Sequence, residues 1–248
     1  ERVLAVLNHE LPDQIPRFEV WIDALQAELG CVDSAGVYAA VGQDCVMMPS
    51  RLPEGSNAWR TGVDEWGRVW RDGIYDGGAI SGDSDLERYT PPLSYVDRRF
   101  DPERVHNVQR AFPEHCLIFG THNGPFTAGY LAMGFQRFFL ALHDDLAFVR
   151  RLLEARTEWC IAVYQRAAAL GAEILVLGDD ASSSMGPMVP PGLWRELVLP
   201  LHRRIVQSLD VPVIWHSDGN VAQLLPMAVE AGFAGVHGLD PTAGMGLA

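Results

Sequence analysis

Short apolar segments alternate with longer helix-forming segments through the second half of this 248-residue chain. Residues 115–120, 173–177, 211–215 and 235–239 are mostly apolar, and amphipathic stretches long enough for helices separate them. A strand that is apolar at nearly every position is buried on both faces, as in a parallel sheet covered by helices. The alternation therefore predicts an α/β fold built on a parallel sheet.

A repeated unit favours a barrel over an open sheet. The stretches GAEILVLGDD at 171–180 and AGFAGVHGLD at 231–240 each run from a helix-ending glycine through apolar positions to an aspartate. Adding strands expected at 17–21 and 44–49 gives about six strands, whereas a closed barrel needs eight. We therefore predict one (β/α)8 TIM-type barrel domain over residues 1–248, with its last strands outside the given chain.

Residues 53–100 have a different character. They are rich in Gly, Asp, Trp and Pro, and they contain the stretch DEWGRVWRDG. The alternation of Trp66, Val69 and Trp70 in this stretch predicts a β-hairpin inserted near residues 56–80. We interpret the two tryptophans as packing residues of that hairpin.

Composition excludes several classes of protein. The net charge is −13 and all basic residues are arginines, so binding to a nucleic-acid backbone is not expected. No apolar run approaches the roughly 20 residues of a membrane span. The four cysteines form no CxxC pair, which is typical of reduced thiols in a cytoplasmic protein. The usual glycine-rich dinucleotide and nucleotide motifs are missing from the sequence.

Polar side chains occupy the carboxyl ends of the expected strands. In a (β/α)8 barrel these ends meet at one mouth, where the chemistry takes place. We therefore expect the polar groups to converge on one cavity that binds a small-molecule substrate. The candidates are Glu19, Ser50, His122, Asn123, Asp179, Asp180, His216, Asp218, His237 and Asp240.

The stretch VPVIWHSDGN contains the sharpest of these patterns. Its His216 and Asp218 lie two residues apart, so at a strand end both can face the same side. An imidazole nitrogen and a carboxylate oxygen form half of a zinc-ligand set, but this pair alone more often indicates a loop-bonded histidine followed by a helix-capping aspartate. Asp240 is open to the same capping interpretation. Of the adjacent Asp179 and Asp180, one can structure the loop while the other faces the cavity.

Several motifs, in this order, resemble the uroporphyrinogen decarboxylase superfamily, which includes the cobalamin-linked methyltransferases. The opening RVLAVLNHELPDQIP is similar to the start of that family. The stretch THNGPF resembles its GP-F strand end, and LGDDASSSMGP resembles its aspartate-bearing strand. VPVIWHSDGNV resembles the segment written H-x-C-G-N in the methyltransferases. The resemblance covers nearly the whole chain and implies the (β/α)8 barrel.

The resemblance is closer to the methyltransferase-like branch than to the true decarboxylases. The decarboxylases carry an arginine-rich stretch after the first strand, which holds the carboxylates of the porphyrinogen. This chain has no arginine between Arg17 and Arg51, and its DEWGRVW stretch is similar to a hairpin of the methyltransferase-like branch. In that branch zinc binds through the histidine and cysteine of H-x-C and a later cysteine. Here His216 matches the histidine, and Asp218 stands in place of the cysteine.

The resemblance implies a methyl transfer between methylcobalamin, held by a partner corrinoid protein, and a small thiol, alcohol or ether. We predict that His216 and Asp218 bind the metal, and that Asp180, His216 and Asp179 are catalytic. Substrate binding is assigned to Glu19, His122, Asn123 and Asp240. One alternative is a metal-free decarboxylase of a porphyrinogen or another small carboxylate, and a second is a non-catalytic ligand-binding barrel subunit. A homodimer is also compatible with the sequence.

Overall fold

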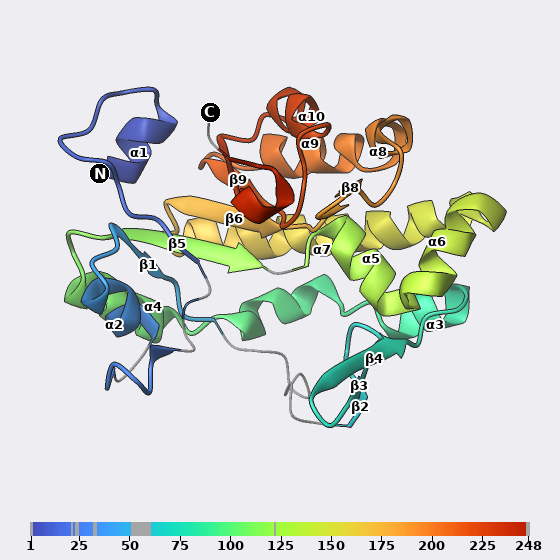
Figure 1. The fold of residues 1–248 in the computed structure, drawn as a ribbon. Helices are drawn as coiled ribbons and strands as arrows, with labels where there is room; N and C mark the ends of the chain where they lie inside the picture. The colour runs from blue at the N-terminus through green and yellow to red at the C-terminus, as the bar shows by residue number, and fades with distance from the viewer. Residues whose placement is uncertain are drawn as a thin grey trace.

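The central element is a five-stranded parallel sheet. The computed structural model describes residues 2–246 except 21, 23–24, 32–33, 51–60 and 122. Within these residues the strands follow one another in the sheet in chain order, and β1 and β10 form its edges (Figure 1). A doubly wound sheet would reverse its order part-way, so this order is that of a (β/α) barrel and the predicted α/β class is confirmed. The strands are β1 (Cys45–Met47), β5 (Cys116–Thr121), β6 (Ile174–Gly178), β9 (Val213–His216) and β10 (Gly235–His237).

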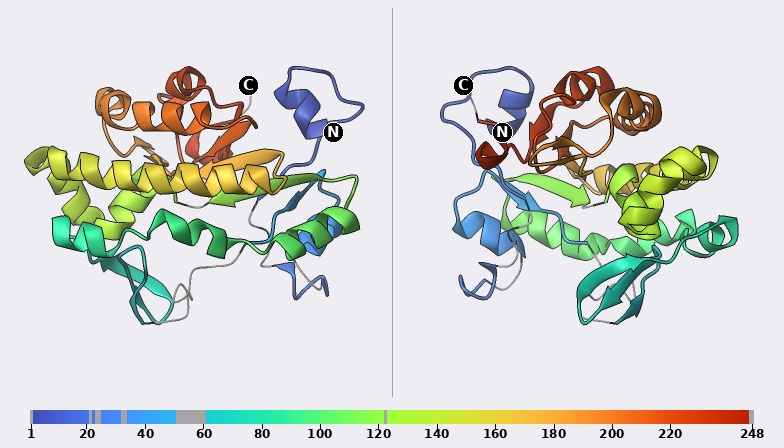
Figure 2. Two further views of the ribbon diagram at one scale, coloured as in Figure 1. Left: turned by 180° about the vertical axis from the view of Figure 1, so that it is seen from behind. Right: turned by 45° about the vertical axis from the view of Figure 1, so that its right-hand side comes forward.

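Helices join each parallel strand to the next. Figure 2 shows the long helix α7 beside the sheet, with α8, α9 and α10 on one side of it and η2 and α4 on the other. No helix within the described ranges is both long enough and apolar enough to cross a membrane. The helices are α1 (Arg2–Leu7), α2 (Ser34–Ala40), α3 (Asp83–Arg88), η2 (Leu93–Arg99), α4 (Pro102–Ala111), α5 (Pro125–Met133), α6 (Phe135–Asp144), α7 (Leu146–Ala169), α8 (Pro191–Leu197), α9 (Leu199–Gln207), α10 (Leu225–Ala231) and η3 (Pro241–Ala243).

The strand predicted at 17–21 is wrong for the described residues 17–20, which form no strand. The amides of Arg17 and Val20 donate to carboxylate side chains instead of to a sheet ladder. Asp44 accepts from the Arg17 amide through its carboxylate at 2.7 Å and donates its own amide to the Arg17 carbonyl at 2.9 Å. The Val20 amide donates to the carboxylate of Glu19 at 3.0 Å. The segment therefore runs beside β1 without pairing along it.

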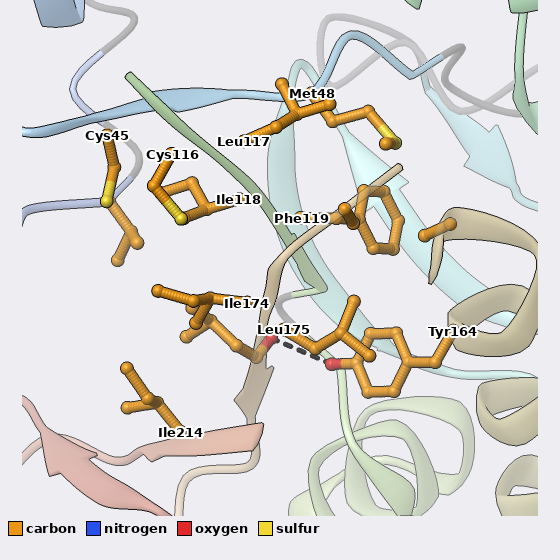
Figure 3. Close-up of a cluster of buried hydrophobic side chains, with 14 of the residues drawn as sticks. Cys45, Met48, Cys116, Leu117, Ile118, Phe119, Tyr164, Ile174, Leu175 and Ile214 are labelled. Carbon is orange, nitrogen blue, oxygen red and sulfur yellow. Dashed lines mark hydrogen bonds between the residues drawn. The ribbon is translucent and has the colours of Figure 1, made fainter. Parts of the chain in front are cut away.

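The main core lies between the sheet and its surrounding helices. Figure 3 shows Phe119 of β5 and Leu175 of β6 beside Tyr164 of α7, whose hydroxyl donates to the Val176 carbonyl at 2.7 Å. Cys45 and Cys116 are register partners on β1 and β5, and both are free thiols buried in this core. Burying one large apolar side chain, such as a leucine or phenylalanine of this core, contributes about 1.5–3 kcal/mol to the free energy of unfolding. The packing of many such side chains holds the strands in a fixed register.

The predicted insertion is a three-stranded antiparallel sheet rather than a simple hairpin. Its strands are β2 (Gly62–Val63), β3 (Arg68–Arg71) and β4 (Ile74–Gly78). The buried Asp64 organises it, because its carboxylate accepts from the amides of Trp66 and Arg68, from the Arg68 guanidinium and from the Trp70 indole. The two tryptophans do not pack together as a pair. Trp66 packs against Trp159 of α7, and Trp70 packs against Tyr75 of β4.

One buried arginine connects the insertion to α7. Arg156 donates to the carbonyl of Trp66 at 2.8 Å and to that of Tyr89 at 2.9 Å, and its guanidinium lies over the Trp66 ring. Burial lowers the pKa of Arg156 to about 10, so the group stays charged at neutral pH. One side chain of α7 therefore holds both the turn between β2 and β3 and the end of α3.

Replacing Arg156 with methionine should loosen this attachment. Arg156→Met keeps an unbranched apolar stem but leaves two buried carbonyls without their donor, which costs about 1–3 kcal/mol of unfolding free energy. Urea unfolding followed by circular dichroism measures the change. Arg110→Met is the matched control, because Arg110 is exposed and its guanidinium bonds to Asn107 in the preceding turn of α4. Equal stability of the two variants would contradict the anchoring role.

Candidate functional site

Three polar side chains meet just beyond the carboxyl ends of β6 and β9. Asp180, His216 and Asp218 each offer one ligand atom, and these three atoms lie within 4.8 Å of one another. The strand ends are level because Gly178 of β6 is the register partner of His216 on β9. The Asp218 amide donates to the carboxylate of Asp180 at 3.3 Å, which holds the two tips together. His216 Nε2 lies 3.8 Å from Asp218 Oδ1.

The alternation of side chains along β9 directs His216 to this place. Successive side chains of a strand point to opposite faces, so Trp215 and His216 face different ways. Trp215 is buried among the helices, where it packs against Trp194 of α8 and Phe233. Its large apolar ring fixes which face of β9 points toward the helices. His216 is therefore left on the inner face, at the strand end.

The same alternation separates the two aspartates after β6. Asp179 is fully buried, and its carboxylate accepts from the amides of Phe126 and Thr127 at 3.3 and 2.7 Å. It also lies 2.7 Å from Nε2 of His202 on α9. Gly124, the N-cap residue of α5, has no side chain to cap the helix, and a Cβ there would come within 2.4 Å of Asp179 Cβ.

Asp179 thus caps α5 from a neighbouring strand. These contacts give Asp179 a structural role, and the catalytic role predicted from the sequence stays a prediction.

The pKa values of Asp180 and His216 are shifted in opposite directions. Burial, and then the nearby carboxylate of Asp218, raise the pKa of Asp180 to about 6. Burial, and then the adjacent His237 ring, lower the pKa of His216 below its ordinary value. Both shifts favour the neutral form of the group. A cluster of this kind gains stability from a positive charge placed between its oxygen and nitrogen atoms.

A second histidine continues the cluster on β10. His216 Nδ1 lies 2.8 Å from His237 Nδ1, and His237 Nε2 lies 3.0 Å from Glu19 Oε1. The sequence places His237 at a strand end but assigns it no role. The repeated unit ending at 240 marks His237 as a strand-end residue, and the register of β9 and β10 places it beside His216. Glu19 was assigned to substrate binding, and in the structure its carboxylate lies within hydrogen-bond distance of His237.

The remaining predicted residues lie apart from these contacts or outside the described chain. Asp240 is the N-cap of η3, where its carboxylate accepts from the amide and hydroxyl of Thr242 at 2.7 Å each. The capping interpretation of Asp240 therefore accounts for its contacts. Asn123 lies in the turn after β5, with its amide donating to the Thr121 hydroxyl at 3.2 Å, and its substrate-binding role stays a prediction. His122 lies outside the described residues.

The polar loop after β6 is tied to the loop after β9. The Ala181 amide donates to the buried hydroxyl of Ser217 at 3.0 Å, and the Asn220 amide donates to the Ser183 carbonyl at 2.8 Å. Gly219 lies so close to this loop that a Cβ would come within 2.6 Å of the Ser183 carbonyl. These contacts hold the cluster on two mutually braced loops.

Comparisons with known proteins bear on the family and the fold of this chain. A sequence model of the uroporphyrinogen decarboxylase (URO-D) family matches residues 82–248, about two thirds of the chain. A methylated-thiol–coenzyme M methyltransferase of Methanosarcina mazei is 34% identical over 109 residues, which are 44% of this chain and 29% of that protein. The solved structure of a methyltransferase from Methanosarcina mazei superimposes with a TM-score of 0.74 at 19% identity, over 95% of this chain and 74% of that one.

The matched stretch of the coenzyme M methyltransferase is thus less than a third of its length, and the solved structure shows the shared fold alone. The family match contains the whole cluster of Asp180, His216 and Asp218. The two relatives named above are methyltransferases, and the family match shows that the chain belongs to the uroporphyrinogen decarboxylase family.

Proposed function

We propose that this chain is a metal-assisted methyltransferase. It moves a methyl group between methylcobalamin on a partner corrinoid protein and a small thiol, alcohol or ether. The observation that carries the proposal is the close grouping of Asp180, His216 and Asp218 at the carboxyl ends of β6 and β9. The likeness to methyltransferases supports the reaction class.

The donor set fits a divalent cation. One imidazole nitrogen and two carboxylate oxygens are a usable ligand set for zinc, with an open position left for substrate. Ligand atoms around a zinc ion lie about 2 Å from it, so the 4.8 Å cluster is somewhat wider than a filled site. The side chain of Asp218 is 77% exposed and can rotate inward to close it.

The aspartate at position 218 changes the character of the site. A carboxylate is a harder ligand than the thiolate that stands there in the resembling methyltransferases, so Asp180 becomes important as a third donor. A bound zinc ion lowers the pKa of a thiol or alcohol and so supplies a nucleophile at neutral pH. The residues themselves bind and orient the reacting group between β6 and β9.

The charge of the site argues against the decarboxylase alternative. Glu19, Asp180 and Asp218 bring three carboxyl groups to one end of the sheet, in a chain of net charge −13. A porphyrinogen carries many carboxylates of its own, and the negative charges of the site repel these carboxylates at short range. A small thiol or ether carries no such charge.

Zinc binding is the first test. The metal-free protein titrated with zinc should take up one equivalent, measured by calorimetry and by elemental analysis of the dialysed complex. His216→Ala should weaken the affinity by more than about 100-fold, beyond the range that loss of an outer-shell contact causes. His143→Ala is the matched control, because His143 is 93% exposed and lies on α6.

Two results would overturn the proposal. One is unchanged zinc affinity in His216→Ala. The other is turnover of a porphyrinogen by the metal-free protein, which would favour the decarboxylase.

The two neighbouring aspartates should separate stability from metal binding. Asp179→Asn places an amide where the carboxylate accepts from two backbone amides and meets His202, and should cost about 1–3 kcal/mol of unfolding free energy. Asp180→Asn keeps an oxygen for the Asp218 amide and removes a carboxyl group whose raised pKa disfavours its charged form, so stability should be equal or higher.

Zinc affinity should show the reverse order, with the larger loss in Asp180→Asn. Urea unfolding and zinc calorimetry on both variants measure the two effects. A variant of Asp180 that unfolds earlier than the variant of Asp179 would contradict this division of roles.

A further inference from the structure

Two histidines face each other across neighbouring parallel strands at the edge of the site. His216 and His237 are register partners on β9 and β10. Register partners in a parallel sheet project to the same face, which places the two rings side by side. Their centroids are 5.0 Å apart, the planes are inclined by 39°, and the two Nδ1 atoms are 2.8 Å apart. A distance this short between two ring nitrogens requires one proton between them.

The carboxylate of Glu19 decides which ring holds that proton. His237 Nε2 lies 3.0 Å from Glu19 Oε1, and a carboxylate at this distance needs a donor. A neutral His237 must therefore carry its proton on Nε2, which leaves its Nδ1 as an acceptor. His216 must then donate from Nδ1. The lone pair of His216 is consequently on Nε2, the nitrogen on the side of Asp218.

We propose that Glu19 and His237 are positioning residues that hold His216 in the tautomer with its proton on Nδ1 and its lone pair on Nε2. The use of that lone pair for a metal ion rests on the proposed function. A metal-binding histidine depends on the hydrogen bond at its other nitrogen, which fixes both its tautomer and the orientation of the ring. We refer to Glu19, His237 and His216 as the relay.

The surroundings of the relay are built for this contact. The side chains of His216 and His237 are only 14% and 19% exposed, so bulk water does not compete freely for their nitrogens. The Phe18 ring meets the His237 ring edge-on at 5.9 Å between centroids. Gly238 has a φ of +88°, and a Cβ there would lie 3.1 Å from His216 Nδ1 and 2.8 Å from the Ser217 carbonyl.

The space beside the Nδ1 atoms of His216 and His237 is thus open because residue 238 is a glycine. A substitution there meets strained backbone and crowds the same nitrogen that bonds to His237.

The tautomer can be observed directly in the metal-free protein. Histidines labelled with ¹⁵N give different long-range couplings for a proton on Nδ1 and on Nε2, and His216→Ala assigns the signal of His216. Spectra are recorded at about pH 8, above the ordinary histidine pKa of about 6.5. We expect His216 to carry its proton on Nδ1. In His237→Ala and Glu19→Ala this preference should be lost.

Two conservative variants test the atoms involved. His237→Asn places an amide oxygen near the position of Nδ1 and should restore part of the preference. Glu19→Gln keeps a carbonyl oxygen for His237 Nε2 and should restore more than Glu19→Ala does. His202, which is buried against Asp179, supplies the internal control, because its signals should be unchanged in every relay variant that is correctly folded.

Zinc affinity gives a second readout. His237→Ala should lower it by about 10- to 100-fold, the usual loss when a partner of a metal ligand is removed. A native His216 with its proton on Nε2, or a tautomer unchanged in His237→Ala, would overturn the proposal. The two proposals can fail separately. If zinc does not bind but the tautomer follows the relay variants, the proposed function fails and the positioning role stands.

Discussion

The level register of three neighbouring strand ends is the constraint on which the site depends. Gly178 of β6 pairs with His216 of β9, and His216 pairs with His237 of β10. Register in a parallel sheet is fixed by the buried side chains on both faces, because a slip of one residue would turn every side chain to the opposite face. The packing of Trp215 among the helices therefore sets the position of a histidine on the other face.

The same rule gives two adjacent aspartates different tasks. Asp179 faces the helix layer and supplies an acceptor to the first turn of α5, while Asp180 faces the mouth and bonds to the Asp218 amide. A negative group at a helix N-terminus is favoured by the helix dipole as well as by its hydrogen bonds. The buried partner thus keeps the strand end rigid, and the half-buried partner is available for chemistry.

The sequence was sufficient for the features that depend on local pattern. Apolar runs with polar ends predicted all five strands of the parallel sheet near their observed positions and gathered Asp180, His216 and Asp218 at one edge. Features that depend on distant contacts were not predictable in this way. Residues 17–20 have strand-like composition, but Asp44 and Glu19 take their amides, so no ladder forms. Likewise, the contact between His216 and His237 requires the register of two strands, which the letters alone do not give.

The relay joins parts of the chain that differ in how far the family resemblance accounts for them. His216 and His237 lie within residues 82–248, which the family model matches, whereas Glu19 lies before them. Its position follows from the bonds between Arg17 and Asp44, which hold the segment after the first helix against β1 in place of strand pairing. An N-terminal segment without regular structure thus reaches the last described strand. The orientation of a metal ligand in this site would then depend on the packing of residues 17–20 as well as on the ligand strands.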